Sequence, residues 1–328
     1  MRILILGAGA VGSIMAMRLA WAGHDVWLLA RGSRLSELTK DPFILARHFV
    51  TGELSRTYVH VAGDQQLQRT SSWDLMIVAV QAHQLEGAMP LVDRVVARHV
   101  LFMMNMVGDL HALRERVGVD RFLIGLPALL GEVRDGELRY AVLPGALRFL
   151  QITTIGALPD HFPRGVDRVK RALEGAGFAT TIQEEMQTWL LTHAGFMMPI
   201  MVAGLMSDVD RPLTWATSRL VARGILDNLR LIKRAGHRIE PWNMQLVSML
   251  PPLMLALGVW ASFQFRLVRV VSQAHITHAQ AEVRHLIDAL LRLDPNGQAK
   301  TLMEFSRFLD GVARDESPHK TGRDRKRA

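Results

Sequence analysis

The chain contains no cysteine among its 328 residues. This absence excludes disulfides, thiolate nucleophiles and cysteine-ligated zinc or iron–sulfur sites, and it suits a reducing compartment. The amino terminus also lacks room for a secretory signal, because the apolar run from Ile3 to Leu6 already reads as a core strand. We therefore expect a cytoplasmic protein.

A nucleic-acid-binding motif is also missing, although the net charge is +8 and the sequence pI is about 10.5. No basic helix with interleaved aromatic residues is present. Part of the positive charge lies in residues 315–328, a polar segment that we predict to be a disordered tail. An anionic cofactor and an anionic substrate would equally suit a positive field.

Charged residues are absent from a long apolar segment, Leu246 to Phe263, which approaches the length of a membrane span. Pro251 and Pro252 interrupt it, and serines lie within it. We therefore favour a buried helix pair or a subunit interface over a membrane span. An apolar second half also predicts a homodimer, because large exposed apolar patches tend to be covered.

The segment that is most informative about function is residues 1–31, MRILILGAGAVGSIMAMRLAWAGHDVWLLAR, which reads as strand, glycine turn, helix and strand. This is the context that a G-x-G-x-x-G match needs before it indicates dinucleotide binding. Gly7 permits the tight turn, Gly9 lets a pyrophosphate approach the backbone, and Gly12 lets the helix pack closely. The predicted phosphate-binding residues are Gly7, Ala8, Gly9, Ala10, Val11 and Gly12. The alternative is a helix-start turn that binds nothing.

The second strand is followed by Arg31, where an NAD site usually has an acidic residue on the ribose hydroxyls. A guanidinium can hold a 2′-phosphate in bidentate fashion, so we expect NADP(H). The alternative is that Arg31 and the nearby Arg34 are solvated surface charges.

Alternating apolar strands and helical segments predict a doubly wound α/β domain of Rossmann type over residues 1–184. Residues 132–155 suggest an antiparallel extension of its sheet. Proline-broken apolar segments of helical period then predict an all-α domain over residues 185–314. The strands are expected at residues 3–6, 26–29, 57–62, 75–80, 100–104, 122–124, 138–142, 146–152 and 178–183, with helices at 84–98 and 164–175.

The opening of the chain resembles that of the ketopantoate reductase (2-dehydropantoate 2-reductase) family. This family has a Lys-Ala-x-Gln segment near the cofactor, and here Gln81 replaces the lysine while Gln84 matches. The resemblance implies that Gln81 and Gln84 contact the cofactor, and that Asn105 contacts nicotinamide ribose or substrate. A residue that merely forms the turn at a strand end is the alternative for Asn105.

The second half departs from the family, whose lysine in a Trp-x-Lys-Leu helix donates the proton to the ketone. The comparable segment runs from Trp189 to Pro199 and places no lysine there in any ungapped alignment. His193 could supply this proton, because imidazole can titrate near neutrality. The alternative is a core histidine bonded to a backbone carbonyl.

Glu282 corresponds to a substrate-binding glutamate of the family. With His275 and His278 it lies on one helical face, which could bind a metal but more often forms a polar face. We predict no metal site.

These features together predict an NADPH-dependent oxidoreductase that reduces the carbonyl of a small 2-keto acid or related compound in an interdomain cleft. Asn105 would orient the substrate, and His193 or Glu282 would supply the proton. The alternatives are an NADP(H)-binding sensor or partner-binding protein without turnover, and an opine-dehydrogenase-like imine reductase.

Overall fold

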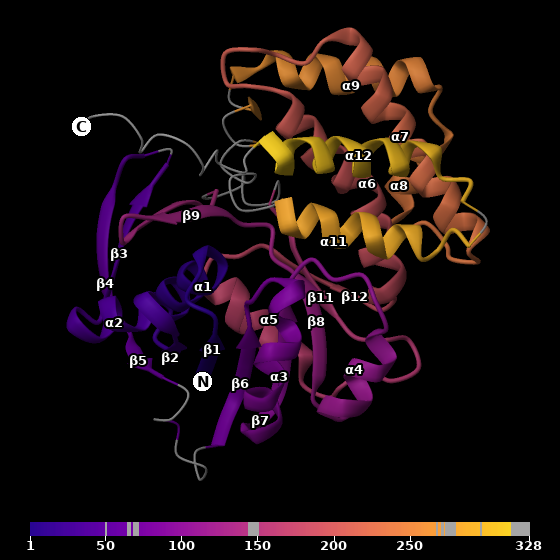
Figure 1. The fold of residues 1–328 in the computed structure, drawn as a ribbon. Coiled ribbons are helices and arrows are strands. Elements are labelled where there is room, and N and C mark those ends of the chain that lie inside the picture. The colour runs from indigo at the N-terminus through magenta and orange to yellow at the C-terminus, as the bar shows by residue number, and fades with distance from the viewer. Residues whose placement is uncertain are drawn as a thin grey trace, which may run out of the picture.

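A large twisted sheet with helices on its faces forms one part of the molecule, and a cluster of helices forms the other (Figure 1). The computed structural model describes residues 1–49, 51–63, 67, 72–143, 151–266, 268–269, 272, 280–295 and 297–315. The large sheet has the strand order β12-β11-β8-β7-β6-β1-β2-β5, and its neighbours are parallel except β8 and β11. Its strands are β1 (Arg2–Leu6), β2 (Asp25–Leu29), β5 (His60–Ala62), β6 (Ser72–Val78), β7 (Val96–Met103), β8 (Phe122–Leu126), β11 (Thr153–Gly156) and β12 (Thr180–Gln183). This sheet confirms the α/β fold class.

A second sheet of four strands has the order β4-β3-β10-β9. It consists of β3 (Phe43–His48), β4 (Leu54–Tyr58), β9 (Leu130–Arg134) and β10 (Glu137–Ala141). The hairpin of β9 and β10 is the antiparallel extension expected from the sequence, but β10 pairs in parallel with β3 rather than with the large sheet. The strand expected at residues 146–152 lies almost entirely outside the described residues.

Two expected elements have different bounds in the structure. The single strand expected over residues 57–62 is two strands in different sheets, because the chain turns at Val59, whose N–H donates to the carbonyl of Pro42 at 3.2 Å. The helix expected over 84–98 ends at Arg94 as α3 (Leu85–Arg94). Residues from Val96 onward alternate between exposed and buried, which is the period of a strand.

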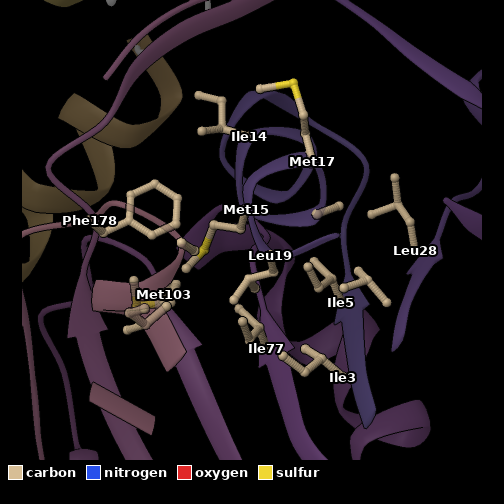
Figure 2. Close-up of a cluster of buried hydrophobic side chains, with 14 of the residues drawn as sticks. Ile3, Ile5, Ile14, Met15, Met17, Leu19, Leu28, Ile77, Met103 and Phe178 are labelled. Atoms are coloured by element: carbon tan, nitrogen blue, oxygen red, sulfur yellow. The ribbon is translucent and has the colours of Figure 1, made fainter. Parts of the chain in front are cut away.

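Helix α1 (Ala10–Trp21) lies between the two sheets. Figure 2 shows Leu19 of α1 beside Ile5 and Ile77 of the large sheet, and Met15 of α1 directed toward Met103 of β7 and Phe178. The opposite side of α1 packs against β9 and β10 of the small sheet, where Leu138 belongs to the same apolar cluster. A helix covered on both sides needs apolar residues all round, which explains why this helix shows so little polar face.

The remaining helices of the α/β part are short. They are α2 (Gly32–Lys40), α3, α4 (Leu110–Val117), α5 (Val166–Gly175) and the 3₁₀ turn η1 (Ala82–Gln84). The described residues after Gln183 form helices and no strand, as the sequence predicts for this half. These helices are α6 (Met186–Met206), α7 (Trp215–Arg234), α8 (Trp242–Met249), α9 (Pro252–Gln264), α11 (Gln280–Leu291) and α12 (Lys300–Asp315).

Helix α6 is the central helix of this cluster and contacts both α7 and α11. It is long and apolar enough to cross a membrane by length and composition, but 61% of its most apolar window is buried inside the protein. Close packing explains its burial. A Cβ on Gly195 would approach the side chain of Ile232 to 2.8 Å, and Asn228 donates to the carbonyl of Gly195 at 3.0 Å.

Helices α8 and α9 are bent by 111° at the double proline, and they are not the buried pair that the sequence allowed. Helix α8 buries no residue, and α9 buries only Ala256, Val259 and Phe263. Of the two alternatives that the sequence left open, burial of this pair within the chain is wrong, and a subunit interface stays a prediction. The reason is that apolar composition indicates that a helix tends to be covered, but not that its own chain covers it.

We predict that Met15→Ala lowers the free energy of unfolding by about 2–5 kcal/mol, because Met15 is 1% exposed at the contact of α1 with the large sheet. Leu45→Ala is the control, since Leu45 of β3 is 43% exposed and should cost no more than about 0.5 kcal/mol. Urea denaturation followed by circular dichroism measures both. Equal losses would show that α1 is not held by this core.

Candidate cofactor and substrate site

The loop between β1 and α1 is shaped by two glycines that leave no room for a side chain. Gly7 has a φ of +114°, and a Cβ there would lie 2.4 Å from the carbonyl oxygen of Ala79. A Cβ on Gly12 would lie 1.8 Å from the carbonyl oxygen of Gly7. These contacts bring the first turn of α1 directly against the end of β1, so the amino end of the helix faces the carboxyl edge of the sheet.

Gly9 differs from these two glycines because its missing side chain faces open space. It is exposed, and nothing lies within 4 Å of the position of its Cβ. It is also the N-cap of α1 without a side-chain capping bond. The amides of the first turn, including those of Ala10 and Val11, carry the positive end of the helix dipole. Open space at Gly9 thus lies beside these amides and suits a pyrophosphate. Phosphate binding by Ala8 and its neighbours stays a prediction.

Two guanidinium groups follow the end of β2. Arg31 is exposed at the N-cap of α2 and donates to the carbonyl of Gly87 at 3.4 Å. Arg34 pairs with Glu37 at 3.0 Å, and its side chain is only 16% exposed. Within the described residues, Nε and Nη2 of Arg34 are buried without a hydrogen-bond partner. The alternative that Arg34 is a solvated surface charge is therefore excluded.

Gln81 and Gln84 hold the turn η1 at the carboxyl end of β6. Each side chain bonds to the backbone of the other residue, and the N–H of Gln81 donates to Oε1 of Gln84 at 3.3 Å. The two amides thus form a reciprocal cap that orients η1. Their contact with a cofactor, which the sequence suggested, stays a prediction.

The loop that carries Asn105 is held at both ends. On one side the N–H of Met104 donates to the carbonyl of Gly125 in β8 at 3.2 Å. On the other side Asp109 caps α4 by accepting from the N–H of Ala112 at 2.9 Å. Asn105 is thereby fixed at the carboxyl edge of the sheet, where ligands of open α/β sheets bind.

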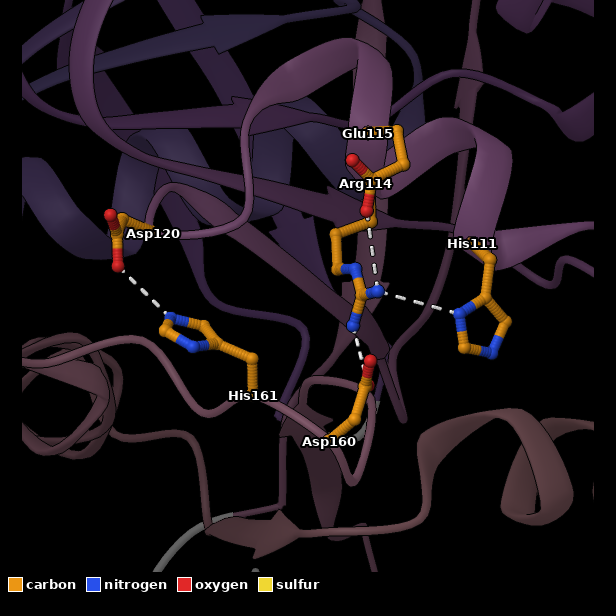
Figure 3. A network of polar contacts seen from close by, with 6 residues as sticks. All are labelled: His111, Arg114, Glu115, Asp120, Asp160 and His161. Carbon is orange, nitrogen blue, oxygen red and sulfur yellow. Dashed lines mark hydrogen bonds and ion pairs between the residues drawn. The ribbon is translucent and has the colours of Figure 1, made fainter.

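Helix α4 is in turn tied to the segment after β11 by the network in Figure 3. Arg114, whose side chain is 8% exposed, bonds to Asp160, Glu115 and His111. His161 pairs with Asp120 at 2.9 Å. The Arg114 guanidinium holds the pKa of Asp160 below its usual range, so this contact is charge-assisted at neutral pH. The network therefore steadies the helix that follows the Asn105 loop.

Asn105 and Glu282 come together although 176 intervening residues separate them in the chain. The side chain of Asn105 donates a hydrogen bond to the Glu282 carboxyl group, while Oδ1 of Asn105 is buried without a partner among the described residues. Burial raises the pKa of Glu282, and the Asn105 bond and the charge of His83 oppose this rise. The pair thus combines a carboxyl group that retains its proton to higher pH with one vacant hydrogen-bond acceptor.

His83 is a residue of this site that the sequence did not single out. It is exposed on η1, which packs against α11, and its charge acts on both Glu282 and His285 of that helix. Its place between Gln81 and Gln84, directly after a buried parallel strand, was the signal available in the sequence.

His193 lies on α6 and stacks on Trp189, with ring centroids 5.2 Å apart and an angle of 9° between the rings. Burial lowers the pKa of His193 to about 4. The imidazole is therefore neutral at pH 7, and the expectation that it titrates near neutrality needs correction. The reason is burial of the ring, which disfavours its charged form, and no carboxylate contributes to the pKa of His193.

The metal site weighed for His275, His278 and Glu282 concerns two histidines that lie outside the described residues. Among the residues that the structure does describe, no group of three or more His, Asp or Glu side chains could hold a metal ion.

Comparisons with known proteins agree with this geometry. A sequence profile described as "Ketopantoate reductase PanE/ApbA" matches residues 3–151. A 2-dehydropantoate 2-reductase from Pyrococcus horikoshii is 27% identical over 194 residues, which is 58% of this chain and 58% of that enzyme. The profile match covers less than half of the chain and lies within its α/β part. The match to this curated member spans less than two thirds of its length.

Solved structures share the fold of this chain over almost its whole length. A D-mandelate dehydrogenase, solved with NADH and anilino(oxo)acetate, superposes with a TM-score of 0.74 at 15% identity, covering 96% of this chain and 99% of that one. A dimeric ketopantoate reductase from Staphylococcus aureus gives a TM-score of 0.66 at 14% identity, covering 95% and 99%. The two-part architecture is therefore that of the family.

We predict that Gly9→Ala leaves the fold intact but weakens NADPH binding, because the new methyl group enters only the space at the helix N-terminus. Gly12→Ala should instead destabilise the protein, since its methyl group meets a backbone oxygen. Thermal denaturation and calorimetric titration with NADPH separate the two effects.

Gly175→Ala in α5 serves as the control, because nothing lies within 4 Å of its Cβ and the site is remote from the loop. It should change neither measurement. If Gly9→Ala leaves NADPH binding unchanged, the phosphates of NADPH do not bind at this loop.

Proposed function

We propose that the protein is an NADPH-dependent oxidoreductase that reduces the carbonyl of a small 2-keto acid or a related compound. Support comes from the similarity to ketopantoate reductases over residues 3–151 and from one observation above all. The Asn105–Glu282 pair places a carboxyl group with a raised pKa and an unpaired acceptor oxygen, among the described residues, at the carboxyl edge of the sheet. Residues 1–184 would act as the cofactor-binding domain and residues 185–314 as the substrate domain of a cytoplasmic enzyme.

The residues present fit a nicotinamide dinucleotide. The open space at Gly9 suits a pyrophosphate at the start of α1. Buried nitrogens of Arg34 that lack partners within the described residues, together with the nearby Arg31, suit the 2′-phosphate of NADP(H). No acidic residue stands between Ala30 and Ser36 to repel that phosphate. The reduced nicotinamide supplies the hydride when bound.

The proton for the developing alkoxide would come from Glu282. Carbonyl reduction needs an acid within hydrogen-bond reach of the oxygen, with a pKa close to the working pH. Burial raises the pKa of Glu282 toward that range. His193 is neutral, so its one ring N–H can donate a hydrogen bond but is too weak an acid to supply the proton. We assign His193 the role of a neutral hydrogen-bond donor that orients the substrate. Oδ1 of Asn105 would accept a hydrogen bond from the ribose or the product hydroxyl.

We infer a substrate with a hydrophobic substituent. Helix α6 carries neither lysine nor arginine, so it offers the substrate no fixed cation. Trp189 instead packs, half-buried, against the apolar cluster that also receives Met106 and Leu126. The D-mandelate dehydrogenase of the same fold was solved with anilino(oxo)acetate, which carries an aromatic ring next to an oxoacetate group. Aromatic 2-keto acids should therefore be reduced faster than ketopantoate.

A second candidate function is binding of NADP(H) without turnover, as a sensor or partner-binding protein. The observation that favours it is the missing lysine in α6. NADPH oxidation followed by absorbance, with a panel of 2-keto acids, separates the two functions. Tight NADPH binding without oxidation would favour the sensor. Oxidation that requires an added amine would favour an opine-dehydrogenase-like imine reductase.

We predict that Arg31→Ala weakens NADPH binding by about 10- to 100-fold, the value of one or two charge-assisted hydrogen bonds. Binding of NADH should stay unchanged, because NADH has no 2′-phosphate. Arg56→Ala is a matched control, since Arg56 is an exposed cation on β4 paired with Asp41. Calorimetry with both nucleotides gives the ratio of their dissociation constants. An equal loss of affinity for NADH and NADPH would contradict the assignment of Arg31 to the 2′-phosphate.

We predict that Glu282→Gln lowers kcat by about 10²- to 10⁴-fold, because glutamine cannot donate the proton. His193→Ala should cost less and act mainly on KM. In the wild type, kcat should fall as the pH rises through the pKa of Glu282, since only the protonated carboxyl group is an acid. His83→Gln removes the charge of His83, which should raise the pKa of Glu282 further. The fall of kcat with pH should therefore move to higher pH.

The control for this profile is His60→Gln, which removes an exposed histidine on β5 that stacks on Trp27. It should leave the profile in place. If kcat falls at the same pH in His83→Gln as in the wild type, or if Glu282→Gln keeps full activity, Glu282 is not the proton donor.

A further inference from the structure

A pocket in the helical part of the molecule lies between α7 and the start of α12 (Figure 1). Its volume is about 600 Å³, which is within the range of small-molecule sites. It shares no lining residue with the phosphate loop, with η1 or with the Asn105–Glu282 pair. We call it the α7–α12 pocket, and four exposed cations line it: Arg223, Arg234, Lys300 and Arg307.

Helical spacing brings these cations to one place. Side chains three or four residues apart lie on one face of a helix. Arg223 and Arg234 belong to such a series on α7, and Lys300 and Arg307 belong to another on α12. The two helices pack closely, because a Cβ on Gly224 of α7 would lie 2.5 Å from the ring of Phe305. The two cationic stripes are therefore held side by side.

The protein itself provides these cations with no counter-charge. Among the described residues, the side chains of Arg223, Lys300 and Arg307 have no hydrogen bond and no ion pair. Arg234 donates to Oε1 of the neutral Gln298 at 3.2 Å. Like charges that gather in this way repel one another, and an anion in the pocket would turn that repulsion into attraction.

Two acidic side chains line the pocket without neutralising its cations. Both oxygens of Asp227 are engaged, because Oδ1 accepts from Arg230 at 3.0 Å and Oδ2 accepts from the hydroxyl of Thr301 at 2.6 Å. Glu304 is exposed on α12, and within the described residues it pairs with no cation. The cations thus stay available to a ligand.

We propose that the α7–α12 pocket binds a small phosphate ester. Three of its four cations are arginines, whose planar guanidinium groups hold phosphate oxygens in bidentate fashion. Leu231 and Met303 add apolar wall for the organic part of the ester. Among the described residues the lining has no histidine, and its one hydroxyl, on Thr301, is used by Asp227. The pocket therefore holds its ligand without transforming it.

A nucleic-acid strand fits the same pocket less well. Proteins that bind single strands combine a cationic groove along the backbone with aromatic side chains on which bases stack. Among the described residues, no aromatic side chain lines the α7–α12 pocket, and its cations converge on one hollow. A compact ligand with its negative charge at one end matches this arrangement.

The test uses phenyl phosphate as the probe and inorganic phosphate as its matched ligand control. Calorimetric titrations are made with saturating NADPH, which occupies the other predicted phosphate site, and are repeated without it. Phenyl phosphate should bind under both conditions and more tightly than inorganic phosphate, because Leu231 and Met303 contact only the ester. The titration without NADPH stands even if the protein binds no nicotinamide, so the result is independent of the proposed function.

Arg307→Ala should raise the dissociation constant of phenyl phosphate about 10- to 100-fold, the value of one or two charge-assisted hydrogen bonds. Arg307→Lys should raise it less, because lysine keeps the charge but not the planar fork. The control is Arg171→Ala, which removes an exposed arginine of α5 and should change nothing. Circular dichroism shows that each variant keeps its helices.

Three results would overturn the proposal. The first is a wild-type protein that binds neither phosphate compound. The second is an affinity for phenyl phosphate that Arg307→Ala leaves unchanged, or that Arg171→Ala lowers by the same factor. The third is binding of an oligothymidine strand that depends on Arg307 and is tighter than that of phenyl phosphate, since the ligand would then be a nucleic acid.

Discussion

The contact between the first turn of α1 and the end of β1 is the constraint from which the candidate site follows. Gly12 lies so close to the carbonyl of Gly7 that no side chain fits between them. This approach aims the amino end of α1 at the carboxyl edge of the sheet. The same edge receives the loop of Asn105 and the turn η1, because parallel strands all end there.

The helical part completes this edge through α11. Packing of α11 against η1 brings Glu282 to Asn105, and burial at this junction raises the pKa of Glu282. Desolvation thus has opposite consequences for two candidate acids. It raises the pKa of the Glu282 carboxyl group and lowers the pKa of the His193 imidazole, because burial always disfavours the charged form. This difference is the reason that we propose Glu282, rather than His193, as the proton donor.

The uncharged helices α8 and α9 stand apart from this chemistry. They lie in the helical part, and their exposed apolar side chains belong to none of the buried clusters. Proline at the bend interrupts what would otherwise be one apolar helix.

The sequence by itself determined the parts that rest on local pattern. Glycine spacing after the first strand predicted the α/β fold and the phosphate loop, and apolar periodicity predicted the helical second half. Only the tertiary structure decided the parts that rest on distant contacts. The pairing of β3 with β10, the meeting of Asn105 with Glu282, the reciprocal cap of Gln81 and Gln84 and the low pKa of His193 are of this kind. Burial and long-range packing determine each of these features, and the local sequence around a residue specifies neither its burial nor its distant contacts.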